Sequence, residues 1–336
     1  LLIANATGCS SIYGGNLPST PYTTDANGRG PAWANSLFED NAEFGLGFRL
    51  TVDQHRARVM RLLAQFADKI PAELNDALHA EATPDVRRAQ VAELRNALQG
   101  VEGAEQLLTD ADALVEKSVW LIGGDGWAYD IGFGGLDHVL SLTENVNILV
   151  LDTQCYSNTG GQASKATPLG AVTKFGEHGK RKARKDLGVS MMMYGHVYVA
   201  QISLGAQLNQ TVKAIQEAEA YPGPSLIIAY SPCEEHGYDL ALSHDQMRQL
   251  TATGFWPLYR FDPRRADEGK LPLALDSRPP SDALAETLLQ EQRFRRLNAQ
   301  QPEVAEQLWK DAAADLQKRY DFLAQLAGKA EKSTSE

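Results

Sequence analysis

The sequence contains little cysteine, no long apolar run and no excess of basic residues. Only three of the 336 residues are cysteine, Cys9, Cys155 and Cys233, which excludes a disulfide scaffold and predicts a reducing compartment, the cytoplasm. No apolar run approaches the roughly 20 residues that span a bilayer, so we expect no membrane segment. The 32 basic and 43 acidic residues leave a net charge of −11, whereas nucleic-acid-binding proteins normally carry a basic excess. An acidic globular protein is expected.

The first residues do not resemble the start of a protein. Leu1-Leu2-Ile3-Ala4-Asn5 has neither an initiator Met nor the charged-then-apolar order of a signal peptide. The run is typical of a β-strand entered in its middle. We therefore expect the sequence to be a fragment or a processed portion of a longer polypeptide.

Four short runs of β-branched and aliphatic residues have the character of buried parallel strands. Leu1–Asn5 is a candidate fifth. The runs are Ser118–Gly123, Val146–Leu151, His196–Ile202 and Ser225–Tyr230, and helical patterns between and after them cover Ile131–Leu142, Ala206–Ala220 and Leu240–Thr253. This alternation predicts an α/β fold with a doubly wound, mostly parallel sheet.

The rest of the chain differs in character from this alternating part. Residues 36–117 are polar, with amphipathic spacing and no strand pattern, so we predict a helical insertion there. Residues 1–35 would begin the domain whose α/β core is residues 118–265. Residues 266–336 are predicted to form a mostly helical carboxyl-terminal extension.

The turn Gly124-Asp125-Gly126 is the strongest local chemical signal. It follows a predicted strand, and in open α/β sheets ligands bind at the carboxyl ends of strands. A Gly-rich turn offers backbone N–H groups to a phosphate, but an Asp would repel the phosphate unless a cation lay between them. Mg²⁺ takes one or two carboxylates together with phosphate oxygens and waters. The turn is thus consistent with a metal-bound phosphate, and equally with a simple tight turn.

The next predicted strand brings a second oxygen ligand. Thr153 follows that strand one strand–helix–strand unit after Asp125, so two parallel strands deliver an acid and a hydroxyl to one edge of the sheet. The pattern resembles the thiamine diphosphate signature, in which GDG is followed at a distance by two asparagines. Thr153 stands where the first asparagine is usual, and its hydroxyl can still bind Mg²⁺.

Longer segments resemble one family. GGDGWAYDIGFGGLDHVL (123–140), DTQCYSNTGGQASKATPLGA (152–171) and ANATGCSSIYGG (4–15) are similar to the carboxyl-terminal thiamine domain of pyruvate:ferredoxin (or flavodoxin) oxidoreductase. The similarity continues through residues 221–233 to residues 254–264, so it covers most of the chain. It implies a thiamine diphosphate-binding fold.

The resemblance also implies roles for single residues. Gly124, Asp125 and Gly126 would bind the cofactor, and Asp125 and the Thr153 hydroxyl would be Mg²⁺ ligands. The main-chain carbonyl of Cys155 would be the third protein ligand of Mg²⁺. Asn158 would face the thiazolium and bound pyruvate, as the catalytic residue.

Two of the cysteines are implied to be iron ligands. Cys9 and Cys233 match two of the four cysteines that hold the [4Fe–4S] cluster nearest the thiamine, while the other two form a CxxC pair that this sequence lacks. Both cysteines follow predicted strands, at the edge expected for Asp125 and Thr153. An iron–sulfur cluster normally takes four thiolates, so these two would not retain it alone.

The family activity implied is the oxidative decarboxylation of pyruvate to acetyl-CoA and CO₂. The thiamine cofactor serves as the electron sink, coenzyme A takes the acetyl group, and electrons pass through [4Fe–4S] clusters to ferredoxin or flavodoxin. The remainder of the polypeptide would supply the pyrimidine-activating Glu and most substrate contacts. A homodimer is expected, and the chain by itself is expected to be inactive.

Two other functions are alternatives for this sequence. A non-redox thiamine diphosphate-dependent decarboxylase or ligase would use the same turn, but Cys9 and Cys233 argue against it. A nucleotide-binding module without chemistry would normally carry G-x-G-x-x-G after its first strand, and that motif is absent.

Two further features have alternative interpretations. The basic run from Lys180 to Lys185 is either a solvated loop face or a docking patch for an acidic electron acceptor. His236, close after Cys233, is either an ordinary loop histidine or a residue that tunes the cluster.

Overall fold

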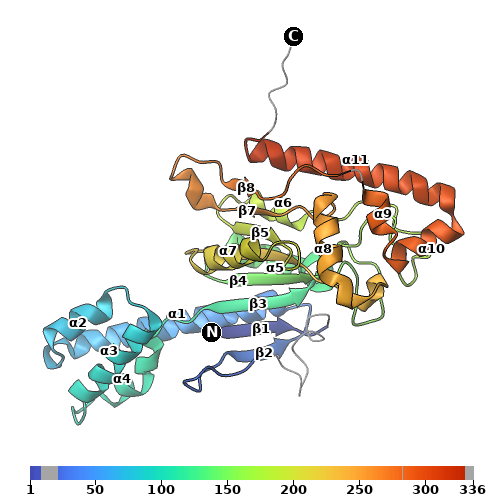
Figure 1. Ribbon diagram of the computed structural model, residues 1–336. Helices are drawn as coiled ribbons and strands as arrows, with labels where there is room; N and C mark the ends of the chain where they lie inside the picture. Colours follow the sequence, from blue (N-terminus) through green and yellow to red (C-terminus); the bar gives the residue numbers. More distant parts are fainter. Residues whose placement is uncertain (9–21, 282, 330–336) are drawn as a thin grey trace.

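An eight-stranded open sheet forms the centre of the computed structural model, which describes residues 1–8, 22–281 and 283–329 (Figure 1). The strand order is β2-β1-β3-β4-β6-β5-β7-β8. The strands are β1 (Leu2–Ala6), β2 (Ala32–Ser36), β3 (Val119–Gly124), β4 (Asn147–Asp152), β5 (Tyr198–Ile202), β6 (Ser225–Tyr230), β7 (Tyr259–Phe261) and β8 (Leu273–Leu275). Strands β1 to β6 pair in parallel, while β7 and β8 add an antiparallel margin beside β5. The predicted α/β fold with a mostly parallel sheet is confirmed.

Helices cover the sheet and continue past the strands to the left and to the right in Figure 1. They are α1 (Asn41–Gln65), α2 (Ala72–His79), α3 (Pro84–Ala97), α4 (Glu105–Asp110), α5 (Phe133–Ser141), α6 (Leu187–Met192), α7 (Leu208–Glu219), α8 (Ser243–Ala252), α9 (Leu284–Leu288), α10 (Gln292–Gln300) and α11 (Pro302–Leu326). Within the described parts of the chain, none is long and apolar enough to cross a membrane.

The strands that were predicted from the sequence are those with continuous apolar runs. All four predicted strands are present, as β3, β4, β5 and β6, and the candidate fifth is β1. Strand β5 starts at Tyr198 instead of His196, and the His196 ring lies 2.9 Å from the carbonyl oxygen of Leu142. Strands β7 and β8 were not predicted, since each has only three residues. Strand β2 was also missed, because it lies at the margin of the sheet and none of its residues is fully buried.

The helix after β3 starts differently from the prediction. A π-helical turn, Gly126–Ile131, follows Asp125 directly, and α5 begins only at Phe133. Tyr129 and Trp127 of the turn are both buried. The turn therefore carries aromatic side chains into the core beside the end of β3.

Two hydrophobic cores share helix α1. The main core lies between the sheet and its covering helices and includes Ala42 near the start of α1. A smaller core joins the second half of α1, through Val59 and Leu63, to α2, α3 and α4, the helices at the left of Figure 1. The division into residues 1–35, 36–117, 118–265 and 266–336 stays a prediction.

The carboxyl-terminal helices lie over the β7–β8 side of the sheet (Figure 1). Helix α11 is anchored to the α6 region by an ion pair between Arg319 and Asp186, with Nε and Oδ2 2.6 Å apart. Leu297 of α10 and Leu308 of α11 pack together with Leu169 from the long segment after β4. The carboxyl-terminal helices therefore reach the carboxyl edge of the parallel strands.

The approach of α1 to the sheet depends on a glycine. A Cβ atom at Gly45 would lie 2.2 Å from Leu121 Cγ on β3, a distance that no real packing tolerates. Gly47 lies on the exposed side of the same helix, and a Cβ there would meet nothing within 4 Å. The two glycines thus share a helix but not an environment.

We expect Gly45→Ala to lower the free energy of unfolding by about 1–3 kcal/mol, because α1 must move away from β3. Gly47→Ala should instead raise it by about 0.5–1 kcal/mol through helix propensity. Urea unfolding of this chain measures both. Equal effects of the two substitutions would contradict the packing argument.

Candidate functional site

Asp125 and Thr153 meet where the neighbouring parallel strands β3 and β4 end. The Thr153 hydroxyl lies 2.8 Å from Asp125 Oδ1 and 3.0 Å from the main-chain oxygen of Cys155. Both side chains are fully buried. Pairing of Gly124 with Leu151 across the two strands sets this register. The three expected oxygen ligands therefore come together in one place.

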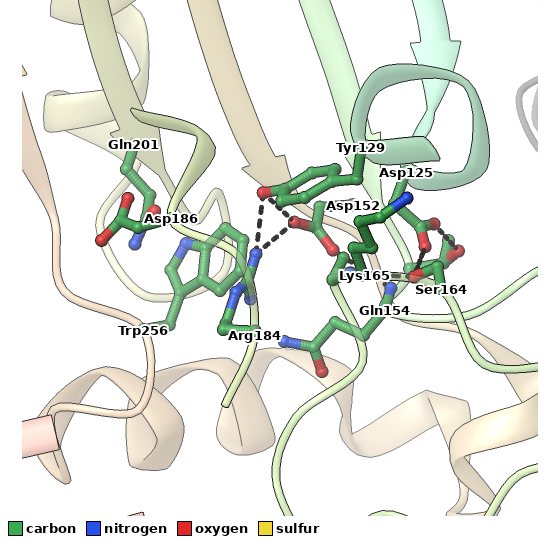
Figure 2. Close-up of polar contacts among 12 residues, drawn as sticks. Asp125, Tyr129, Asp152, Gln154, Ser164, Lys165, Arg184, Asp186, Gln201 and Trp256 are labelled. Carbon is green, nitrogen blue, oxygen red and sulfur yellow. Dashed lines mark hydrogen bonds and ion pairs between the residues drawn. The ribbon is translucent and has the colours of Figure 1, made fainter. Parts of the chain in front are cut away.

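The other carboxyl oxygen of Asp125 accepts a hydrogen bond from a second hydroxyl. Ser164, on the segment after β4, donates from Oγ to Asp125 Oδ2 at 2.5 Å (Figure 2). Within the described ranges, no basic side chain forms an ion pair with Asp125; its side-chain partners are the hydroxyls of Thr153 and Ser164. Ser164 was not singled out from the sequence, because nothing local marks a serine as an acid's partner.

The carboxyl group of Asp125 is costly to ionise without a cation. Burial raises the pKa of Asp125 to about 8, and the charge of Asp152 adds to the rise, against the hydrogen bonds from Ser164 and Thr153. An isolated buried carboxylate is strongly disfavoured. A bound divalent cation would remove this penalty.

The oxygen donors fit Mg²⁺. A carboxylate, a hydroxyl and a main-chain carbonyl are all hard oxygen ligands. Adjacent ligands of an octahedral Mg²⁺ lie about 2.9 Å apart when each metal–oxygen distance is about 2.0–2.1 Å. The separations of 2.8 Å from Thr153 to Asp125 and 3.0 Å from Thr153 to Cys155 are hydrogen-bond distances close to that spacing.

A second buried carboxyl, Asp152, has the cationic partner that Asp125 lacks. Arg184 Nη2 lies 2.5 Å from Asp152 Oδ2, and the Tyr129 hydroxyl donates to the same oxygen at 2.8 Å (Figure 2). The guanidinium carbon of Arg184 is 4.8 Å from the ring centroid of Trp256. Two adjacent acids are thus handled differently: Asp152 is compensated within the protein, and Asp125 is not.

The basic run is divided between the interior and the surface. The side chain of Arg184 is only 10% exposed in its ion pair, and Lys180 Nζ donates to the carbonyls of Ser164 at 3.0 Å and Thr167 at 2.6 Å. Burial lowers the pKa of Lys180 to about 8. Lys182 is exposed. A single solvated or docking face is therefore the wrong interpretation for Lys180 and Arg184.

Gln154, between two of the expected ligands, has a left-handed backbone with φ of 62°. It is fully buried. Its N–H donates to Asp152 Oδ1 at 3.1 Å, and its carbonyl accepts from Thr167 Oγ1 at 2.6 Å. Arg293, from the start of α10, donates from Nη2 to Gln154 Oε1 at 2.7 Å. Several parts of the chain hold this one residue.

His236 supports the main chain of the same loop. The ring is fully buried, and Nε2 lies 2.7 Å from the carbonyl oxygen of Thr153. Since a carbonyl can only accept, Nε2 carries the hydrogen. Burial and the nearby charge of Arg293 lower the pKa of His236 well below its usual value. The histidine is thus a buried neutral donor to Thr153, which is a structural role within its loop.

The cysteines of the site lie close to one another. Cys233 Sγ donates to Ser157 Oγ at 3.2 Å, and Cys155 Sγ is 3.7 Å from the same oxygen. A hydrogen bond with Cys155 lowers the pKa of Cys233 to about 6, against the opposing effect of burial. Cys9 lies outside the described residues. Among the residues that are described, no group of three or more His, Cys, Asp and Glu side chains could hold a metal ion.

The other expected residues lie on the same edge. Gly126 packs under an aromatic ring, since a Cβ there would be 2.5 Å from Tyr156 Cε1. Asn158 is exposed on the loop that follows Tyr156. A cavity of about 560 Å³ borders Gln154 and Cys155 and continues to Arg293.

Arg184 should contribute to stability because it compensates the buried charge of Asp152. We expect Arg184→Met to lower the free energy of unfolding of this chain by about 3–5 kcal/mol, since Asp152 is left buried without its cation. The double variant Arg184→Met/Asp152→Asn should recover at least about half of that loss. Lys182→Met, on the exposed part of the run, should stay within about 0.5 kcal/mol.

Chemical denaturation of the four proteins measures these differences. A double variant as unstable as Arg184→Met would show that Asp152 is not the group that Arg184 serves.

The sequence is similar to known proteins along its whole length. Residues 89–229 match the family model described as thiamine pyrophosphate enzyme, C-terminal TPP binding domain. The chain is 91% identical over 336 residues to the probable pyruvate-flavodoxin oxidoreductase of Escherichia coli (strain K12), covering 100% of this chain and 29% of that protein. It is 55% identical over 339 residues to the pyruvate-flavodoxin oxidoreductase of Rhodospirillum rubrum, covering 98% of this chain and 28% of that protein.

The chain is also similar to a relative whose name includes ferredoxin. Identity to the pyruvate:ferredoxin oxidoreductase of Moorella thermoacetica is 47% over 341 residues, covering 97% of this chain and 29% of that protein. The chain spans less than a third of the length of these curated relatives. The resemblance predicted from the sequence motifs is confirmed.

Proposed function

We propose that this chain, similar along its whole length to one segment of the pyruvate-flavodoxin oxidoreductases, anchors thiamine diphosphate and Mg²⁺ in an enzyme that oxidises pyruvate to acetyl-CoA and CO₂. The observation that carries the proposal is the group of three oxygens from Asp125, Thr153 and Cys155. That group lies in a sequence similar to a thiamine diphosphate-binding domain.

The Mg²⁺ site would use the carboxylate of Asp125, the hydroxyl of Thr153 and the main-chain carbonyl of Cys155. Diphosphate oxygens and water would complete the coordination. Asp125 does not cap the helical turn that follows it, because its oxygens are directed to Thr153 and Ser164. The carboxylate is therefore placed for a cation and not for the helix.

The remaining residues of the edge would bind and orient the reactants. Backbone N–H groups of the turn Gly124-Asp125-Gly126 would donate to the diphosphate. Asn158, exposed on the neighbouring loop, would contact the substrate. When bound, the cofactor supplies the electron sink for decarboxylation.

Cys9 and Cys233 would provide two of four ligands for a [4Fe–4S] cluster, with the others coming from the remainder of the polypeptide. Support comes from the position of Cys233: its thiol contacts Ser157 Oγ, which donates to the Thr153 hydroxyl at 2.9 Å. Two hydrogen bonds thus separate the thiol from a proposed metal ligand. An electron acceptor here would be close to the reacting cofactor.

The same proposal includes the partners of the whole enzyme. Coenzyme A would accept the acetyl group, ferredoxin or flavodoxin would accept the electrons, and the enzyme would be a cytoplasmic homodimer. The two names among the relatives, pyruvate-flavodoxin and pyruvate:ferredoxin oxidoreductase, support either acceptor.

In the full-length protein, we expect Asp125→Asn to weaken binding of Mg²⁺ and thiamine diphosphate by at least about 100-fold, because a charged inner ligand is lost. Stability without cofactor should be kept or raised, since Asn replaces a carboxyl whose ionisation is disfavoured by burial. Titration calorimetry and thermal unfolding measure the two effects. Asp137→Asn, a partly exposed acid on α5, is the control. Unchanged cofactor affinity in Asp125→Asn would contradict the proposed metal site.

The cysteines give a second test in the full-length protein. We expect Cys9→Ala and Cys233→Ala to remove or convert the cluster beside the thiamine and to reduce pyruvate-dependent electron transfer steeply. Cys155→Val should retain the cluster, because Val keeps the carbonyl and similar bulk. Electron paramagnetic resonance, iron content and turnover are measured together. Equal damage at all three positions, or no iron in the unaltered protein, would favour a non-redox thiamine enzyme instead.

A further inference from the structure

Gln154 has an unusual backbone for its residue type. A non-glycine residue with positive φ is strained and persists only where its surroundings impose the conformation. In the described part of the chain, the only other such residue is Phe175, which is 88% exposed, whereas Gln154 is fully buried. Rotation about the N–Cα bond of Gln154 moves Cys155 relative to Thr153. The left-handed value therefore decides where the Cys155 carbonyl lies.

Three contacts hold this conformation: one is local, from Asp152, and the other two come from Thr167 and Arg293, farther along the chain. Asp152 receives the Gln154 N–H, and Thr167 donates to the Gln154 carbonyl. Asp152 is itself held by Arg184. The third contact is made by Arg293, which donates to the Gln154 side-chain oxygen at 2.7 Å. Both the main chain and the side chain of Gln154 are thus held.

Arg293 is itself fixed within the carboxyl-terminal helices. Its Nε lies 2.6 Å from Glu291 Oε2, and both side chains are almost wholly buried. Glu291 also accepts from Gln246 Nε2 of α8 at 2.9 Å, and the Arg293 carbonyl accepts from Val172 N at 2.9 Å. A buried ion pair is weak evidence for a purely stabilising role. This one directs a further donor, Nη2, to the side chain of Gln154.

We propose that Arg293 is a positioning residue, which keeps Gln154 left-handed and thereby holds the Cys155 carbonyl beside Thr153 and Asp125. The proposal rests on the proposed function, because it takes that carbonyl as a Mg²⁺ ligand. It makes the start of α10 part of the metal site without direct contact to the metal. The carboxyl-terminal helices would then act on cofactor affinity as well as on the fold.

Two substitutions at Gln154 separate the effect of its backbone conformation from the effect of its contact with Arg293. Gln154→Ala and Gln154→Gly both remove the partner of Arg293, but only Gly adopts positive φ without strain. In the full-length protein with thiamine diphosphate present, we expect Gln154→Ala to weaken Mg²⁺ binding by about 10-fold or more. The loss in Gln154→Gly should be several-fold smaller. Calorimetric titration with Mg²⁺ measures both, and Mn²⁺ paramagnetic resonance reports the same site.

Substitutions at Arg293 test the positioning role itself. Arg293→Met should weaken Mg²⁺ binding about as much as Gln154→Ala, and Arg293→Lys should restore part of it because an ammonium can still donate to Gln154. In the Gln154→Gly background, Arg293→Met should cause no further loss of Mg²⁺ affinity, although it should still lower the melting temperature. Arg296→Met, an exposed neighbour on α10, is the control and should leave affinity unchanged.

The outcomes are distinguishable. Equal affinity losses in Gln154→Ala and Gln154→Gly would overturn the proposal, as would an Arg293→Met variant that loses melting temperature but binds Mg²⁺ normally. If Arg293→Met does not fold, the two Gln154 variants decide the question alone. Absence of Mg²⁺ binding in the unaltered protein would overturn the proposed function together with this inference.

Discussion

The buried carboxylate of Asp125 is the constraint on which the edge of this sheet depends. A charge in that position must be compensated, and the described residues offer it hydroxyls but no cation. Thr153 and Ser164 direct their hydroxyls inward for this reason. The loop that carries Thr153 therefore surrounds a carboxyl whose side-chain partners are hydroxyls and whose ionisation is disfavoured by burial.

The neighbouring acid, Asp152, is compensated in a different way. Asp152 is one residue from Thr153, equally buried, and carries its own arginine, clamped by Tyr129 and stacked near Trp256. The fold can thus bring a basic side chain to this depth and does so at one carboxyl only. A site that keeps an acid uncompensated beside one that is paired is suited to a divalent cation.

Distant segments complete the site by holding its main chain. His236, after β6, fixes the carbonyl of Thr153, and Arg293, at the start of α10, holds the side chain of Gln154. Neither touches the proposed ligand oxygens of Asp125. The precision of the proposed Mg²⁺ site would depend on these supports, because metal ligands must be held within fractions of an ångström.

The sequence by itself determined the parallel strands and the meeting of Asp125 with Thr153. Continuous apolar runs are legible locally, and neighbouring parallel strands must end at one edge of a sheet. Only the tertiary structure decided that Arg184 turns inward, that Gln154 is left-handed and that Arg293 reaches it. These depend on partners far away in the chain, and whether a charge is buried is a property of what surrounds it, which no local pattern records.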